Sequence, residues 1–167
     1  TDMFYTYQDI AVKDREESQN YDCILKRGVT VLQLNCRQEP CPDYMKSFKY
    51  TITGNCGNVF NPTTGHCLQK TTLTRIYDIS GDQLTGKRFS FSIYFFLGAD
   101  NVSDITLTTQ STDTEDKVVK SLSFENVHMV KGKMTIYKGP FLSTHSSASF
   151  IIDSPTIPDS GFSTEFE

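Results

Sequence analysis

The stretch KRFSFSIYFFLG, residues 87–98, decides the fold of this chain. Large apolar side chains occupy every second position and smaller or polar ones lie between them: Phe89, Phe91, Ile93 and Phe95 against Ser90, Ser92 and Tyr94. Successive side chains of a β-strand point to opposite faces, so a period of two predicts a strand with one buried face. An amphipathic helix would instead repeat every three to four residues.

The same alternation extends outward from this stretch in both directions. It recurs in residues 21–36, 48–54, 103–111 and 117–127, and residues 148–153 form one further expected strand. Turn-forming residues separate these runs, in residues 38–43, 61–65, 80–86, 98–101, 113–116 and 131–133. Strands at this spacing predict an all-β fold, a two-sheet antiparallel β-sandwich of about seven to nine strands in a single domain, residues 1–167.

The expected core consists of the apolar side chains that share one face of each run. They are Leu32, Leu34, Phe48, Tyr50, Ile52, Phe89, Phe91, Ile93, Phe95, Ile105, Leu107, Leu122, Phe124 and Ile136. Burying each large side chain contributes about 2 kcal/mol.

Composition narrows the possible functions. The 167 residues carry a formal net charge of −4, with a pI near 5.3, which argues against a nucleic-acid binder that relies on phosphate neutralisation. The longest apolar stretch, residues 93–99, is as long as a strand, so no membrane-spanning helix is expected.

Residues suited to catalysis or metal binding are sparse. The histidines His66, His128 and His145 stand in separate contexts, and none has a histidine or glutamate partner at ligand spacing. No phosphate-binding loop, nucleophile elbow or zinc-protease motif occurs. We therefore expect no cofactor, no metal and no enzymatic activity. Residues 125–139, ENVHMVKGKMTIYKG, predict a strand end, a hairpin tip solvated by Lys131 and Lys133, and the next strand.

Five cysteines leave three arrangements open. If residues 21–36 and 46–54 formed a hairpin, Cys23 would lie near Cys56 across the ladder. Local closure would instead join Cys36 to Cys41 and Cys56 to Cys67, and between these two arrangements we favour the local pairs. In the third arrangement all thiols are free. A disulfide would add about 2–4 kcal/mol of stability.

Several motifs resemble the fimbrillin-like subunits of type V pili of Bacteroidales. The signature ENV-x-h-x-x-x-x-x-T-x-x-x-G, in which h is apolar, falls on Glu125, Asn126, Val127, Met129, Thr135 and Gly139. Residues 1–12, TDMFYTYQDIAV, are similar to the family's entry into its second domain. The family's L-x-R-x-V strand has its counterpart in Leu25, Arg27 and Val29. Residues 58–65, NVFNPTTG, are similar to the stretch that follows.

This resemblance implies an architecture and an assembly function. The chain would be the transthyretin-like, Greek-key C-terminal domain of a larger exported lipoprotein, held at the outer membrane only by an upstream lipid anchor. It would be a structural or accessory subunit, at the tip or the anchor, of a cell-surface fimbria. Its partners would be other pilus subunits, joined by β-strand addition, and it would bind no nucleic acid. The candidate strand-exchange segment carries Phe162, Thr164 and Phe166.

A glycan-binding module is the alternative function. Surface lipoproteins of outer-membrane nutrient-uptake systems also use β-sandwiches, and a glycan site needs exposed aromatic rings on which sugars stack. The candidate rings are Tyr44, Tyr77, Tyr94 and Tyr137, which are scattered along the sequence.

Overall fold

The computed structural model describes residues 3–11, 20–36, 40–79, 86–142 and 151–153, and within these ranges the chain forms strands and no helix. The strands are β1 (Phe4–Tyr5), β2 (Lys26–Arg27), β3 (Thr30–Asn35), β4 (Met45–Thr53), β5 (Cys56–Gly57), β6 (Phe60–Asn61), β7 (His66–Cys67), β8 (Leu73–Asp78), β9 (Ser90–Leu97), β10 (Asn101–Asp113), β11 (Val118–Val130), β12 (Met134–Lys138) and β13 (Ile151–Asp153). None of the described residues belongs to a helix long and apolar enough to cross a membrane.

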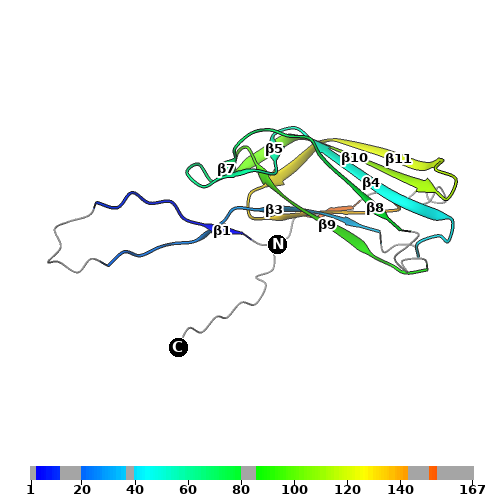
Figure 1. The fold of residues 1–167 in the computed structure, drawn as a ribbon, viewed down its shortest axis with the longest axis horizontal. Coiled ribbons are helices and arrows are strands. Elements are labelled where there is room, and N and C mark those ends of the chain that lie inside the picture. The colour runs from blue at the N-terminus through cyan, green and yellow to red at the C-terminus, as the bar shows by residue number, and fades with distance from the viewer. Residues whose placement is uncertain (1–2, 12–19, 37–39, 80–85, 143–150, 154–167) are drawn as a thin grey trace, which may run out of the picture.

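Two sheets form the two layers of a β-sandwich, which confirms the predicted fold class (Figure 1). The strand order is β11-β10-β4-β8 in one sheet and β13-β12-β3-β9-β5 in the other. Neighbouring strands run antiparallel except β12 and β3, which are parallel, with Thr135 opposite Leu32. The wholly antiparallel pairing that the sequence predicted is therefore wrong for this one pair.

The core lies between the sheets, where the predicted alternation places it. Phe48 and Ile52 of β4 are fully buried, and Phe91 and Phe95 of β9 are nearly so. The rings of Phe48 and Phe91 stack across the two layers with their centroids 4.7 Å apart. The contact between β4 and β9 therefore joins the two sheets directly.

Four of the expected core residues are less buried than predicted. Ile136 is half-buried because β12 turns its other face inward, so that Thr135 and Tyr137 lie in the core instead. Register explains this: Ile136 pairs with Gln33, whereas Tyr137 pairs with the buried Leu34. Phe89, Leu122 and Phe124 are partly buried and pack against the edge of the core.

The predicted hairpin tip at residues 131–133 is wrong, and the hairpin considered for residues 21–36 and 46–54 does not form, because the chain changes sheets at these points. The strands β3 and β4 belong to different sheets, so each can bury its apolar face against the other layer. The bend after β11 likewise carries the chain into the second sheet, through Gly132 with φ of +75°. Lys133 is exposed, but the Lys131 side chain is only 17% exposed and pairs with Asp100, so it does more than solvate a turn.

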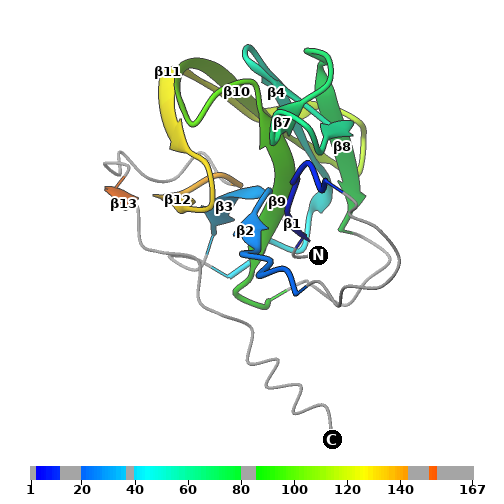
Figure 2. The same ribbon diagram turned by 90° about the vertical axis from the view of Figure 1, so that its left-hand side faces the viewer.

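A two-limbed arm extends from one end of the sandwich (Figures 1 and 2). It consists of residues 4–11 and 20–27, and its limbs are paired at the base, where Phe4 lies opposite Arg27 and Tyr5 opposite Lys26. Farther out, the Tyr21 hydroxyl donates to the carbonyl of Ala11 at 3.1 Å. The sequence did not predict the arm, because residues 21–36 were expected to form one continuous strand. In the structure only residues 30–35 of this segment form β3 of the sandwich, and residues 20–27 belong to the arm.

Candidate functional site

One side of the sandwich has incompletely paired strands in both layers. β8 is the last strand of its sheet among the described residues. In the other sheet, β3 covers one side of β9 along its length, but β5 pairs with the opposite side only at Phe96 and Leu97. Backbone groups along an edge strand offer hydrogen bonds that a further strand can satisfy. The described part of the chain therefore leaves two edges that could accept one.

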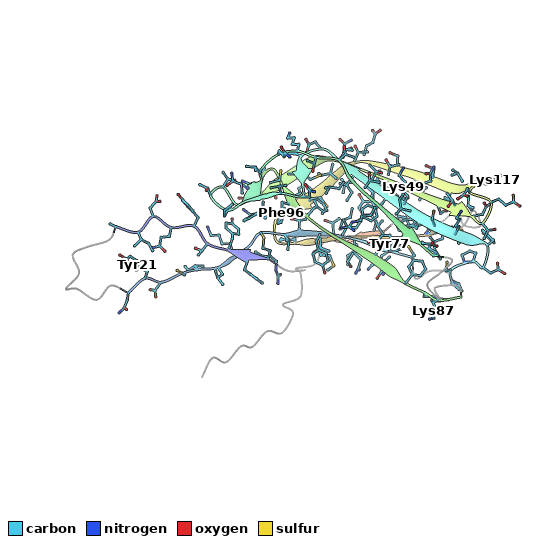
Figure 3. The ribbon with its side chains drawn as sticks, in the orientation of Figure 1. Tyr21, Lys49, Tyr77, Lys87, Phe96 and Lys117 are labelled. Carbon is cyan, nitrogen blue, oxygen red and sulfur yellow. The ribbon has the colours of Figure 1, made fainter. Side chains whose placement is uncertain are left out.

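A groove with a volume of about 640 Å³ lies along these two edges. Its walls come from β8, from both faces of β9 and from the residues next to the arm's base. The lining residues are Met3, Val29, Tyr50, Arg75, Tyr77, Ser92, Ile93, Tyr94, Phe95 and Phe96. Figure 3 labels two of them, Tyr77 of β8 and Phe96 of β9. Half of the ten side chains are aromatic, so the groove is suited to apolar or flat partners.

Strand register explains why Arg75 and Tyr77 face this groove. Tyr50 lies opposite Arg75, and Phe48 lies opposite Tyr77, so both β8 side chains share the inward face of β4. The Tyr77 ring contacts Phe91, with 4.5 Å between the centroids. Arg75 is exposed at the edge and is the charged side chain among the lining residues. The groove therefore combines aromatic walls with one positive charge.

Tyr50 is a buried lining residue of the groove. Burial raises the pKa of Tyr50, and the charge and hydrogen bond of the neighbouring Tyr77 raise it further. Tyr50 is only 3% exposed, so its phenol stays neutral and can donate or accept a hydrogen bond. The pair offers a polar contact beside the aromatic rings of the groove.

The arm's base is fixed beside the groove. The Tyr5 ring packs edge-on against Phe60 at 4.9 Å, and the Lys131 ammonium lies 5.8 Å from the centre of the Tyr5 ring. Gly65 has φ of +74°, and a Cβ there would overlap the Tyr5 hydroxyl. The Gly28 amide donates to the carbonyl of Met3, a lining residue, at 2.9 Å. These contacts set the direction in which the arm leaves the sandwich.

Asp100 is linked to the arm's base through Lys131, which also donates to the Tyr5 hydroxyl. It accepts hydrogen bonds from Lys131 and from His66, whose Nε2 is 3.1 Å from the carboxylate. The hydrogen bond from Lys131, followed by that from His66, lowers the pKa of Asp100. Although burial lowers the pKa of Lys131, hydrogen bonds to Asp100 and Tyr5 outweigh burial and raise it.

The cysteines are distributed over both ends of the sandwich and the arm. Cys23 is exposed on the arm. Because β3 and β4 form no hairpin, the reason for expecting a Cys23–Cys56 disulfide no longer holds. Cys36 and Cys41 are both buried. In the reduced form that the structure holds, burial, followed by the nearby Cys67, raises the pKa of the Cys56 thiol to about 12. The local pairs Cys36–Cys41 and Cys56–Cys67 stay a prediction.

The structure brings together two of the four candidate tyrosines. Tyr77 and Tyr94 both line the groove, whereas Tyr137 is buried in the core and Tyr44 lies outside the groove. Sequence reasoning missed Arg75 and Phe96. The sequence did contain a signal for Phe96. Tyr94 and Phe96 put aromatic rings on the outer face of β9, where the alternation of the strand predicts polar side chains.

The predicted strand-exchange segment has no described geometry. The strand-exchange residues Phe162, Thr164 and Phe166 lie outside the described residues, as does His145. His128 is exposed on β11 and its Nδ1 is 2.9 Å from the Ser103 hydroxyl. Among the described residues, no three His, Cys, Asp or Glu side chains gather closely enough to hold a metal ion.

No protein-family model and no curated protein matches the chain. Among solved structures, it is similar to a disulfide-locked mutant of intermedilysin with human CD59, with a TM-score of 0.30 and 12% identity over 82% of this chain and 26% of that one. It is also similar to the membrane-binding domain of pneumolysin, with a TM-score of 0.32 and 12% identity over 78% of this chain and 99% of that domain. Likenesses this weak carry no argument about fold or function.

Proposed function

We propose that the chain is a structural or accessory subunit, at the tip or the anchor, of a cell-surface fimbria, and that it assembles with neighbouring subunits by β-strand complementation. The observation that supports this proposal best is the aromatic groove between the open edges of β8 and β9. The proposal includes the transthyretin-like topology, export to the outer-membrane surface through an upstream lipid anchor, and the absence of catalysis.

The groove has the features that strand addition requires. An added strand gains main-chain hydrogen bonds from an edge, and its alternate side chains enter pockets between the sheets. Residues 90–95 of β9, which β5 leaves uncovered, offer an edge about 20 Å long, enough for six residues of a partner strand. The aromatic side chains beside this edge supply the apolar surface that such a strand would bury.

A charge placed in the groove tests this proposal. Tyr94→Glu alters a lining side chain that is 46% exposed, and Val118→Glu is a matched control because Val118 is 47% exposed on β11, away from the groove. We expect Tyr94→Glu to weaken self-association at least about tenfold in sedimentation experiments, as loss of a central interface contact does. Equal association of the two variants would overturn the proposal.

A glycan-binding module is a second candidate, because Tyr77 and Tyr94 meet in one groove with Arg75 and Ser92. Rings that stack on a sugar and polar groups that bond its hydroxyls are what such a site needs. A glycan array probed with the wild-type chain and with Tyr94→Ala separates the two functions. Binding that this single change abolishes would favour the module over the fimbrial subunit.

A further inference from the structure

The arm exposes an unusual share of the molecule's apolar surface. Of the twelve large hydrophobic side chains that are substantially exposed in the described chain, six lie on the arm: Phe4, Tyr7, Ile10, Tyr21, Ile24 and Leu25. Ile24 is 77% exposed and Leu25 is 61% exposed. Isolated exposed apolar residues are common, but six on one short segment point to an interaction surface.

The arm cannot bury these side chains in its own groove as it stands. Its base is held by Tyr5 against Phe60 and by Arg27, whose guanidinium lies 5.1 Å from the centre of the Phe4 ring. From there the limbs extend away from the sandwich along the molecule's longest axis (Figure 1). Among the described residues these side chains stay exposed, so a second molecule is a candidate to cover them.

The arm and the groove match in length and in charge. The limb of residues 6–11 is about 20 Å long when extended, like the uncovered edge of β9. The described outer residues of the arm, 6–11 and 20–25, carry Asp9 and Asp22 and no basic side chain. The groove carries Arg75 as its charged lining residue. An acidic, apolar ribbon is thus complementary to a basic, aromatic groove.

We propose that the arm of one copy lies along β8 and β9 in the groove of a second copy of this chain. This inference rests on the proposed function, because it assigns an occupant to the same groove. Arm and groove are different surfaces, so the contact is heterologous, and repeating it adds copies in one direction. Such a contact gives an open filament when the rotation between copies does not close into a ring.

Cross-linking between two distinguishable copies tests this contact. The tagged copy keeps Cys23, the exposed thiol of the arm, and the untagged copy carries Cys23→Ser and Ser92→Cys in the groove. Both copies carry Cys67→Ser. The control replaces Ser92→Cys with Ser123→Cys, at an exposed position on β11. We expect a short bis-maleimide to give about tenfold more tagged–untagged dimer with Ser92→Cys, because docking raises the effective concentration.

A matched pair of arm variants supplies a second measurement. Leu25 on the arm and Leu68 outside both arm and groove are each 61% exposed. We expect Leu25→Glu to weaken self-association about tenfold and Leu68→Glu to leave it unchanged. Equal effects of the two changes would contradict the assignment of the arm.

The outcomes separate this inference from the proposed function. Suppose that Tyr94→Glu blocks association but Cys23 does not cross-link to position 92. The groove then accepts a segment other than the arm, so the inference is overturned and the proposed function stands. If Tyr94→Glu has no effect and the cross-link is absent, both are overturned.

Discussion

Gly65 leaves the space that Tyr5 of the arm occupies. Comparison with Gly86 separates this steric role from the strain that any side chain has at a positive φ. Both Gly65 and Gly86 have φ near +74°, where an alanine is strained, but a Cβ would overlap Tyr5 only at Gly65 and would meet open space at Gly86. We expect Gly65→Ala to displace Tyr5 and to speed tryptic cleavage at Lys26 and Arg27 several-fold relative to Gly86→Ala. Equal cleavage rates would show that Tyr5 does not fix the arm.

Asp100 makes the stability of the arm's base depend on pH. Its pKa is lowered in the folded chain, so its contribution is fully present above the ordinary aspartate value of about 4 and is lost as the pH falls through the folded value. Because Asp100 is 69% exposed, we expect Asp100→Asn to cost less than about 1 kcal/mol at pH 7.

Urea unfolding at neutral and acidic pH measures this contribution. The difference between wild type and Asp100→Asn should vanish near pH 2, while the exposed-site control Glu125→Gln should show no comparable difference at pH 7. A deficit of Asp100→Asn that persists unchanged at pH 2 would exclude an electrostatic origin.

Among the strands, β9 has two roles. Its inner face packs against the other sheet, and side chains from its inner and outer faces line the groove. Phe91 contacts Phe48, Tyr77 and Phe89, so Phe91→Ala should cost about 3–5 kcal/mol through the cavity it leaves. Tyr94→Ala, on the outer face of the same strand, should cost less than about 1 kcal/mol. Denaturant titration measures both, and similar losses would mean that the two faces of β9 are not distinct.

The elements were predictable to the extent that they depend on local alternation. Phe91, Ile93 and Phe95 repeat with a period of two and are buried as expected. Sheet assignment depends instead on contacts distant in sequence, so nothing in the run itself places β3 and β4 in different layers. The groove was beyond prediction for the same reason, because Tyr77 and Tyr94 meet only when the edges of β8 and β9 lie together.

In the molecule as a whole, two segments are candidate occupants of the groove. The resemblance to fimbrillin-like subunits points to the C-terminal residues Phe162, Thr164 and Phe166, whereas the described structure points to the arm. Deleting residues 162–167 should impair polymer formation and leave the domain folded if the C-terminal segment is the donor. Electron microscopy of polymers and circular dichroism of the truncated chain check the two parts of this prediction, and normal polymers would remove the segment from consideration.

The parallel pairing of β12 with β3 also has a consequence for biosynthesis. A ribosome releases residues 30–35 early and residues 134–138 late, so β3 must wait for most of the chain before it gains its second neighbour. Contacts between sequence-distant strands slow folding and prolong the exposure of unpaired edges. A nascent chain of this kind would benefit from a holding chaperone until β12 emerges, whatever the finished protein binds.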